Sequence, residues 1–155
     1  ETLEAFGGAG YIEDTGIPRL LRDAQVLSIW EGTTNVLSLD LLKTLGSGSA
    51  KHDLVEAIGS NLQEASDPSL VPAVEVVASA VRDVQRRCGE TDVEADARGV
   101  AMALGRALGL SLLLRHAQWE LGRGEGRAAA ACRILAARGI APPEGGATDD
   151  HAAVL

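Results

Sequence analysis

The sequence predicts an all-α protein, built as a helical bundle. Alanine, leucine and arginine are abundant and aromatic residues make up only 3% of the chain, a composition that suits closely packed helices. Apolar residues recur at spacings of three and four, which is the period of one helix face. No run of alternating β-branched residues indicates a strand. A chain of 155 residues is long enough to bury a core of its own.

Composition also excludes several classes of function. The net charge of -8 disfavours binding to nucleic acid, which depends on lysine and arginine to neutralise phosphates. Cys88 and Cys132 form no C-x-x-C pair, which is typical of a reducing, cytoplasmic protein. The histidines lack ligand spacing, so we expect no metal site. The longest apolar runs, such as 107–114, are shorter than the ~20 residues of a membrane span, and we expect no membrane contact.

The N-terminal part, residues 1–45, predicts short helices separated by glycine-rich turns. Residues 1–6 indicate the last turn of a helix, and the glycines of 7–10 end it. Those glycines favour either a plain turn or a place where a ligand lies against the main chain. Pro18 predicts the first turn of a helix that runs through Val26. That helix is expected to bury three apolar residues: Leu20, Leu21 and Ala24.

A second helix is expected to begin at Thr33 or Thr34, both good N-caps, and to run through Leu45. Residues 46–50, with the sequence Gly-Ser-Gly-Ser-Ala, are the clearest linker in the chain.

We assign residues 51–140 to a separate helical domain and expect residues 141–155 to be a mobile tail. The first apolar stripe contains Leu54, Ile58 and Leu62. Three further helices are expected: one with Asp67 as N-cap and Gly89 as C-cap, one from about Asp92 to Leu121, and one from Glu125 to Arg138.

The long helix predicted to end at Leu121 carries residues with more than one interpretation. His116 and Trp119 could contact a ligand, although a core or interface position is more typical of isolated residues of these types. Ala101, Gly105 and Gly109 repeat at helical spacing and would let another helix approach closely. None of these patterns by itself indicates chemistry.

Glu31 is the residue whose surroundings most suggest chemistry. It lies between the apolar Trp30 and the flexible Gly32, close to the expected start of a helix. Loss of hydration would raise the pKa of this carboxyl toward the range of a general base. Alternatively, Glu31 occupies the first turn of that helix, where an acid is favoured by the helix dipole. The residues alone leave both interpretations open.

Three segments in fixed order resemble the C-terminal signature of the acyl-CoA dehydrogenase family. They are Gly-Gly-Ala-Gly-Tyr at 7–11, Pro-Arg-Leu-Leu-Arg-Asp-Ala at 18–24 and Ile-Trp-Glu-Gly-Thr at 29–33. The resemblance covers residues 3 to about 42, and three spaced segments are far more specific than any one of them. The residues around Glu31 are most similar to those of the family branch that contains the alkylation-response protein AidB. That branch carries an extra helical region after the signature.

The resemblance implies a fold and a reaction. Residues 1–45 would be the end of the family's C-terminal helical bundle, and 51–140 an appended domain. The family catalyses α,β-dehydrogenation of an acyl-CoA thioester, and Glu31 matches the base that removes the Cα proton while a hydride passes to FAD. The backbone N–H of that residue polarises the thioester carbonyl. Trp30 and Gly32 match positions beside the substrate. The positions that match flavin contacts are Gly7, Gly8, Thr33 and Asn35.

The resemblance further implies an electron-transfer flavoprotein as partner and a homo-oligomer, either dimer or tetramer. The family's N-terminal helical domain and β-barrel are not in this sequence, so the chain is expected to be inactive alone and not to bind FAD tightly. Two other interpretations stay open. One is an AidB-like module for alkylation response or DNA association, against which the eleven basic and fifteen acidic residues after Leu45 argue. The other is a helical oligomerisation domain.

Overall fold

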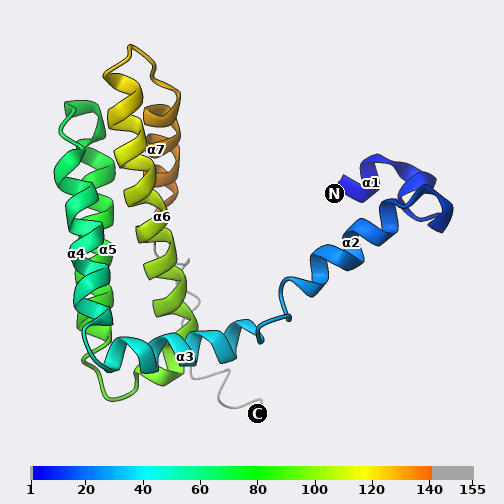
Figure 1. The fold of residues 1–155 in the computed structure, drawn as a ribbon, viewed down its shortest axis with the longest axis horizontal. Coiled ribbons are helices and arrows are strands. Elements are labelled where there is room, and N and C mark those ends of the chain that lie inside the picture. The colour runs from blue at the N-terminus through cyan, green and yellow to red at the C-terminus, as the bar shows by residue number, and fades with distance from the viewer. Residues whose placement is uncertain (1, 141–155) are drawn as a thin grey trace. The chain divides into compact units, whose positions relative to one another are not determined.

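A computed structural model describes residues 2–140, and these residues are helical with no β-strand (Figure 1). The prediction of an all-α protein is confirmed. The chain divides into two compact units, residues 1–38 and residues 39–155, which are described separately below. The mobile tail predicted at 141–155 lies outside the described residues.

The first unit is a series of short helical turns leading into one longer helix. Its elements are α1 (Thr2–Ala5), η1 (Gly7–Gly10), η2 (Glu13–Thr15), α2 (Ile17–Val26) and the start of α3 (Thr34–Gly46). Proline in the first turn of α2 agrees with its predicted start. The predicted burial on α2 is wrong, because Leu20 is 67% exposed, Leu21 is 44% exposed and Ala24 is also exposed. No other residue of the first unit covers that apolar face of α2, since none of its residues is buried.

The second unit contains a bundle of four longer helices. They are α4 (Ala50–Glu64), α5 (Val71–Arg87), α6 (Ala97–Leu121) and α7 (Arg127–Arg138). The short 3-10 turns η3 (Pro68–Leu70) and η4 (Val93–Asp96) precede α5 and α6. The central helix is α6, which packs against α4, α5 and α7, and Figure 1 shows these helices side by side.

The core of the bundle is aliphatic, with a few buried hydrogen bonds between polar groups. Its largest fully buried side chains are Ile58, Leu70, Val77, Val100, Leu114 and Cys132. The Asn61 side-chain amide donates to Ser111 Oγ at 3.1 Å, and Ser111 Oγ donates to the Leu108 carbonyl at 2.8 Å. Asp67 is an N-cap, as predicted, because its carboxylate accepts from Ser69 N at 2.8 Å. The helical segment after Asp67 starts as the 3-10 turn η3 and continues as α5.

The helical stretch Val93–Leu121 is much longer than the uninterrupted apolar runs within it, such as 107–114. It spans 29 residues with a mean hydropathy of 1.4 in its most apolar window, enough in length and composition to cross a membrane. The helix predicted from about Asp92 to Leu121 is present. The expectation, drawn from the apolar runs alone, that nothing in the chain is long and apolar enough to span a membrane is wrong. Gly109 and Ser111 interrupt the apolar run, but they do not interrupt the helix. We interpret α6 as the central helix of the bundle, since it packs against three other helices. Only 44% of the apolar window is buried.

Candidate functional site

The turn between α2 and α3 carries Glu31. The N–H of Trp30 donates to the Val26 carbonyl at 2.9 Å, and the N–H of Gly32 donates to the Ile29 carbonyl at 3.2 Å. Gly32 has a φ of +128°, a conformation that residues with a side chain rarely adopt. Helix α3 begins only at Thr34 and has no acid in its first turn. Glu31 is therefore outside the helix, and the helix-dipole interpretation of this residue is wrong.

The side chains around Glu31 are open to solvent. Glu31 itself is exposed, Ile29 is 62% exposed and Trp30 is 78% exposed. Among residues 2–140, no hydrogen-bond acceptor faces the backbone N–H of Glu31, although the N–H groups on either side of it are bonded within the turn. The described residues therefore present a carboxylate and a free N–H on one exposed turn.

The glycine segment before α2 has two different parts. A Cβ added at Gly7 or Gly8 would meet no atom within 4 Å, and Gly7 has a φ of +54°. At Gly10 a Cβ would overlap the carbonyl oxygen of Leu3. Gly10 is thus required for the close approach of two backbone segments, whereas the main chain at Gly7 and Gly8 is open to a ligand.

Side chains fix this glycine segment to α2. The guanidinium of Arg22 donates to both carboxylate oxygens of Glu13, at 2.9 and 2.8 Å. Thr15 Oγ1 bonds to the carbonyls of Ala9 and Ile12, at 2.7 and 2.8 Å. The bidentate hydrogen bond from Arg22 lowers the pKa of Glu13 below its ordinary value. Arg22 thus holds the segment that precedes α2.

The predicted site residues lie on two segments that α2 separates along the chain. Gly7 and Gly8 belong to η1, which precedes α2, whereas Trp30, Glu31 and Gly32 follow it. Figure 1 shows the α1 segment at the end of α2 that is farther from the turn before α3. The remaining predicted contacts, Thr33 and Asn35, are exposed where α3 begins.

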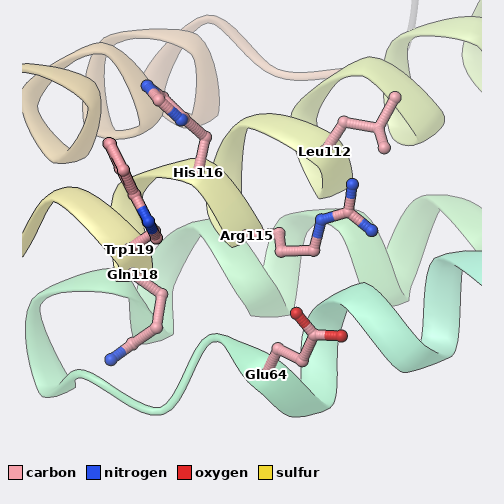
Figure 2. A pocket seen from close by; sticks show the side chains of 6 residues that line it. All are labelled: Glu64, Leu112, Arg115, His116, Gln118 and Trp119. Carbon is pink, nitrogen blue, oxygen red and sulfur yellow. The ribbon is translucent and has the colours of Figure 1, made fainter. Parts of the chain in front are cut away.

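A separate groove lies on the second unit between α4 and α6, with a volume of about 670 Å³. Figure 2 shows the residues that line it: Glu64, Leu112, Arg115, His116, Gln118 and Trp119. The His116 and Trp119 rings stack at 5.5 Å, and the Arg123 guanidinium lies 3.7 Å from the Trp119 ring centre. Trp119 is 53% exposed and His116 is also exposed, so neither occupies the core.

Glu120 is a buried acid that the sequence pattern did not single out. Its Oε2 accepts from Ala128 N at 2.8 Å, which caps the first turn of α7, and its Oε1 lies 3.2 Å from His116 Nε2. The capping is structural. Across residues 2–140, no three His, Cys, Asp or Glu side chains converge as metal ligands.

Comparison with known families assigns both parts of the chain. Residues 1–46 match the family described as "Acyl-CoA dehydrogenase, C-terminal domain". Residues 52–138 match the family described as "Acyl-CoA dehydrogenase 11 C-terminal domain-like". The chain therefore belongs to the acyl-CoA dehydrogenases and corresponds to their C-terminal portion, as the signature predicted.

Individual relatives agree with this assignment. The chain is 41% identical over 132 residues to acyl-CoA dehydrogenase family member 11 of Caenorhabditis elegans, covering 76% of this chain and 21% of that protein. It is 44% identical over 55 residues to the putative acyl-CoA dehydrogenase AidB of Escherichia coli, covering 36% and 10%. It is 48% identical over 40 residues to 3-methylmercaptopropionyl-CoA dehydrogenase of Ruegeria pomeroyi, covering 26% and 7%. The chain thus spans about a fifth of the worm relative. No solved structure matches it.

Proposed function

We propose that this chain is the C-terminal part of an FAD-dependent acyl-CoA dehydrogenase in which Glu31 is the catalytic base. The observation that carries the proposal is the turn between α2 and α3, where an exposed carboxylate and a backbone N–H without an acceptor belong to the same residue. A carboxylate can remove the Cα proton of a thioester, and an N–H can donate to the thioester carbonyl as negative charge develops on it. Gly32 leaves that main chain accessible.

The cofactor proposal rests on residues that are open at both ends of α2. Gly7 and Gly8 have no atoms above their main chain, which fits a segment that lies against a flavin. Thr33 supplies a hydroxyl and Asn35 an amide at the exposed start of α3. When bound, FAD would accept the hydride that leaves Cβ. In this proposal the protein residues bind and orient the substrate and the flavin, and Glu31 holds the proton removed from Cα.

The apolar surface of the first unit supports the proposal that further protein covers it in the whole enzyme. Large exposed patches of this kind mark interaction sites. The exposed apolar residues of this unit include Phe6, Tyr11, Ile12, Leu20, Leu21, Val26, Leu27, Ile29, Trp30, Val36 and Leu37. A water-poor pocket around Glu31 would have to be completed by residues outside this chain, with Trp30 forming part of its acyl-binding wall.

It follows that this chain alone should neither turn over substrate nor hold FAD tightly. For the whole enzyme we propose an acyl-CoA substrate, an electron-transfer flavoprotein as electron acceptor, a homo-oligomeric assembly and a cytoplasmic location.

The test uses the whole enzyme that contains this chain. Glu31→Gln removes the base but keeps the size of the side chain, so reduction of the flavin by a panel of acyl-CoAs should slow by about 10²-fold or more. Asp14→Asn, an equivalent change at an exposed acid of the same unit, is the control and should leave the rate unchanged. Undiminished flavin reduction in the Glu31→Gln enzyme would rule out the assignment.

A further inference from the structure

The segment proposed to lie against the flavin offers its main chain and no side chain. Gly7 and Gly8 carry no Cβ, and their N–H groups donate to no backbone carbonyl among residues 2–140. A cofactor that lies here would contact backbone atoms, so its affinity depends on how firmly the backbone holds one conformation. Gly7 has a φ of +54°, and glycine restrains its own backbone less than any other residue. The restraint must come from residues outside the pair.

Thr15 provides one restraint. Its Oγ1 lies 2.7 Å from the carbonyl oxygen of Ala9, the residue that follows Gly8, and 2.8 Å from that of Ile12. Both distances are those of well-formed O–H···O hydrogen bonds, and the hydroxyl has one proton to donate to either carbonyl. The same oxygen accepts from the N–H of Ile17 at 3.4 Å. Thr15 therefore links the glycine segment to the first turn of α2.

The bidentate pair of Arg22 and Glu13 provides a second restraint. It joins the second turn of α2 to η2 through two hydrogen bonds, at 2.9 and 2.8 Å, and a bidentate pair fixes orientation as well as distance. The N–H of Ile12, the residue before Glu13, donates to the Gly8 carbonyl at 3.0 Å. The position of Glu13 is thus passed on to Gly8 through the main chain.

We propose that Thr15 and the pair of Arg22 and Glu13 are positioning residues for FAD, which act by holding the main chain of Gly7 and Gly8 in the conformation that contacts the cofactor. The inference rests on the proposed function, because it takes FAD as the ligand of this segment. A backbone that is ordered before binding pays less of the ordering cost when the ligand binds. These three side chains should therefore set the affinity for FAD.

The test titrates FAD into the flavin-free form of the whole enzyme that contains this chain and measures the dissociation constant from flavin fluorescence. Thr15→Val removes the hydroxyl and keeps the shape of the side chain, so the dissociation constant should rise about threefold to tenfold, as for the loss of one hydrogen bond. Thr15→Ser keeps the hydroxyl and should restore the affinity. The control is Thr44→Val, which removes another exposed hydroxyl bonded to a backbone carbonyl, that of Asp40, and should have no effect.

A double-mutant cycle distinguishes positioning from a general loss of stability. Gly8→Ala adds a methyl group where no atom lies within 4 Å, so the fold should tolerate it while the surface offered to FAD changes. If Thr15 acts through the glycine segment, Thr15→Val should raise the dissociation constant less in the Gly8→Ala enzyme than in the wild type, because coupled sites are not additive. The same fold increase in both backgrounds would contradict the positioning role.

The pair of Arg22 and Glu13 gives a measurement that is independent of Thr15. Arg22→Ala should raise the dissociation constant about twofold to fivefold, as expected for an exposed ion pair. Exchange of the two charges, by Arg22→Glu together with Glu13→Arg, should recover part of the affinity. Arg19→Ala is the control, since it removes an exposed arginine of the same helix whose partner, Asp23, is also on α2.

The outcomes separate this inference from the proposed function. A whole enzyme that binds no FAD would overturn the proposed function and this inference with it. An enzyme that binds FAD equally well with Thr15→Val and with Arg22→Ala would overturn the positioning role alone and leave the proposed function standing. Equal affinities of the Thr15→Ser and Thr15→Val enzymes would exclude the hydroxyl of Thr15 as a restraint.

Discussion

Glu120 shows how a single buried carboxylate organises one end of the bundle. It is 6% exposed. One carboxylate oxygen accepts a hydrogen bond from the N–H of Ala128, and the other lies beside the ring of His116. The first N–H groups of a helix have no partner inside the helix and need an acceptor from elsewhere. Glu120 provides that acceptor from the last turn of α6, so one side chain joins α6 to α7.

Removal of this carboxylate should destabilise the bundle more than removal of its exposed partner. Glu120→Ala leaves Ala128 N buried without an acceptor, which costs about 1–3 kcal/mol. His116→Ala removes only a solvent-exposed contact and should cost about 0–1 kcal/mol. Urea unfolding followed by circular dichroism measures both. Equal losses of unfolding free energy in the two variants would contradict the capping role.

At the scale of elements, the pair of Arg22 and Glu13 joins α2 to the 3-10 turn before it. Both hydrogen bonds are shorter than 3 Å, and Gly16, with a φ of +74°, allows the chain to reverse between the two elements. This contact fixes the geometry of the glycine segment.

The contact predicts a pH dependence confined to acid solution. The hydrogen bond from Arg22 lowers the pKa of Glu13 in the folded state from 4.5. The contact is therefore fully formed above the unfolded pKa and is lost as the pH falls through the lower, folded value. Carboxyl NMR titration of Glu13 should give a midpoint below 4.5, and Arg22→Ala should move it upward. A midpoint that does not respond to Arg22→Ala would exclude the contact in solution.

At the scale of the whole molecule, the two units differ in how much they bury. All of the described core residues belong to the second unit, from Leu45 to Ile140. The first unit has exposed apolar faces on α2 and on the turn before α3. Stability within a protein follows buried apolar contact, so the units should respond differently to denaturant.

Amide hydrogen exchange should show slow exchange in α4 to α7 and fast exchange in residues 3–38. The thiol of Cys132 provides a second readout, because it is fully buried and burial raises its pKa. Ellman's reagent should react with Cys132 only when the bundle unfolds, while the partly exposed Cys88 reacts in the folded chain. A Cys132→Ala control identifies the slow thiol. Equal exchange in both units would contradict this division.

Several local features were predictable from the residues because their causes are local. The helical period located α4 to α7, and Asp67 was identified as a cap from its type and its place before Pro68. The segment around Glu31 was recognised because three spaced motifs constrain one another. The helix-dipole interpretation of Glu31 failed because it required the start of α3 to within a few residues, which propensity does not resolve.

Burial was not predictable in the same way. Leu20 and Leu21 lie four and three residues before Ala24, the spacing of one helix face, yet all three are exposed. Periodicity shows which residues share a face and not whether another element covers it. The same limit applies to His116 and Trp119, which stack on each other at the surface.

The sequence by itself determined the helical class, the family and the residue proposed as the base, since each depends on residue type and spacing along the chain. Only the tertiary structure decided that Glu120 caps α7, that Arg22 binds Glu13 and that His116 and Trp119 stack on each other. The physical reason is that these features depend on how distant segments meet, and contact in space is fixed by packing and not by local periodicity.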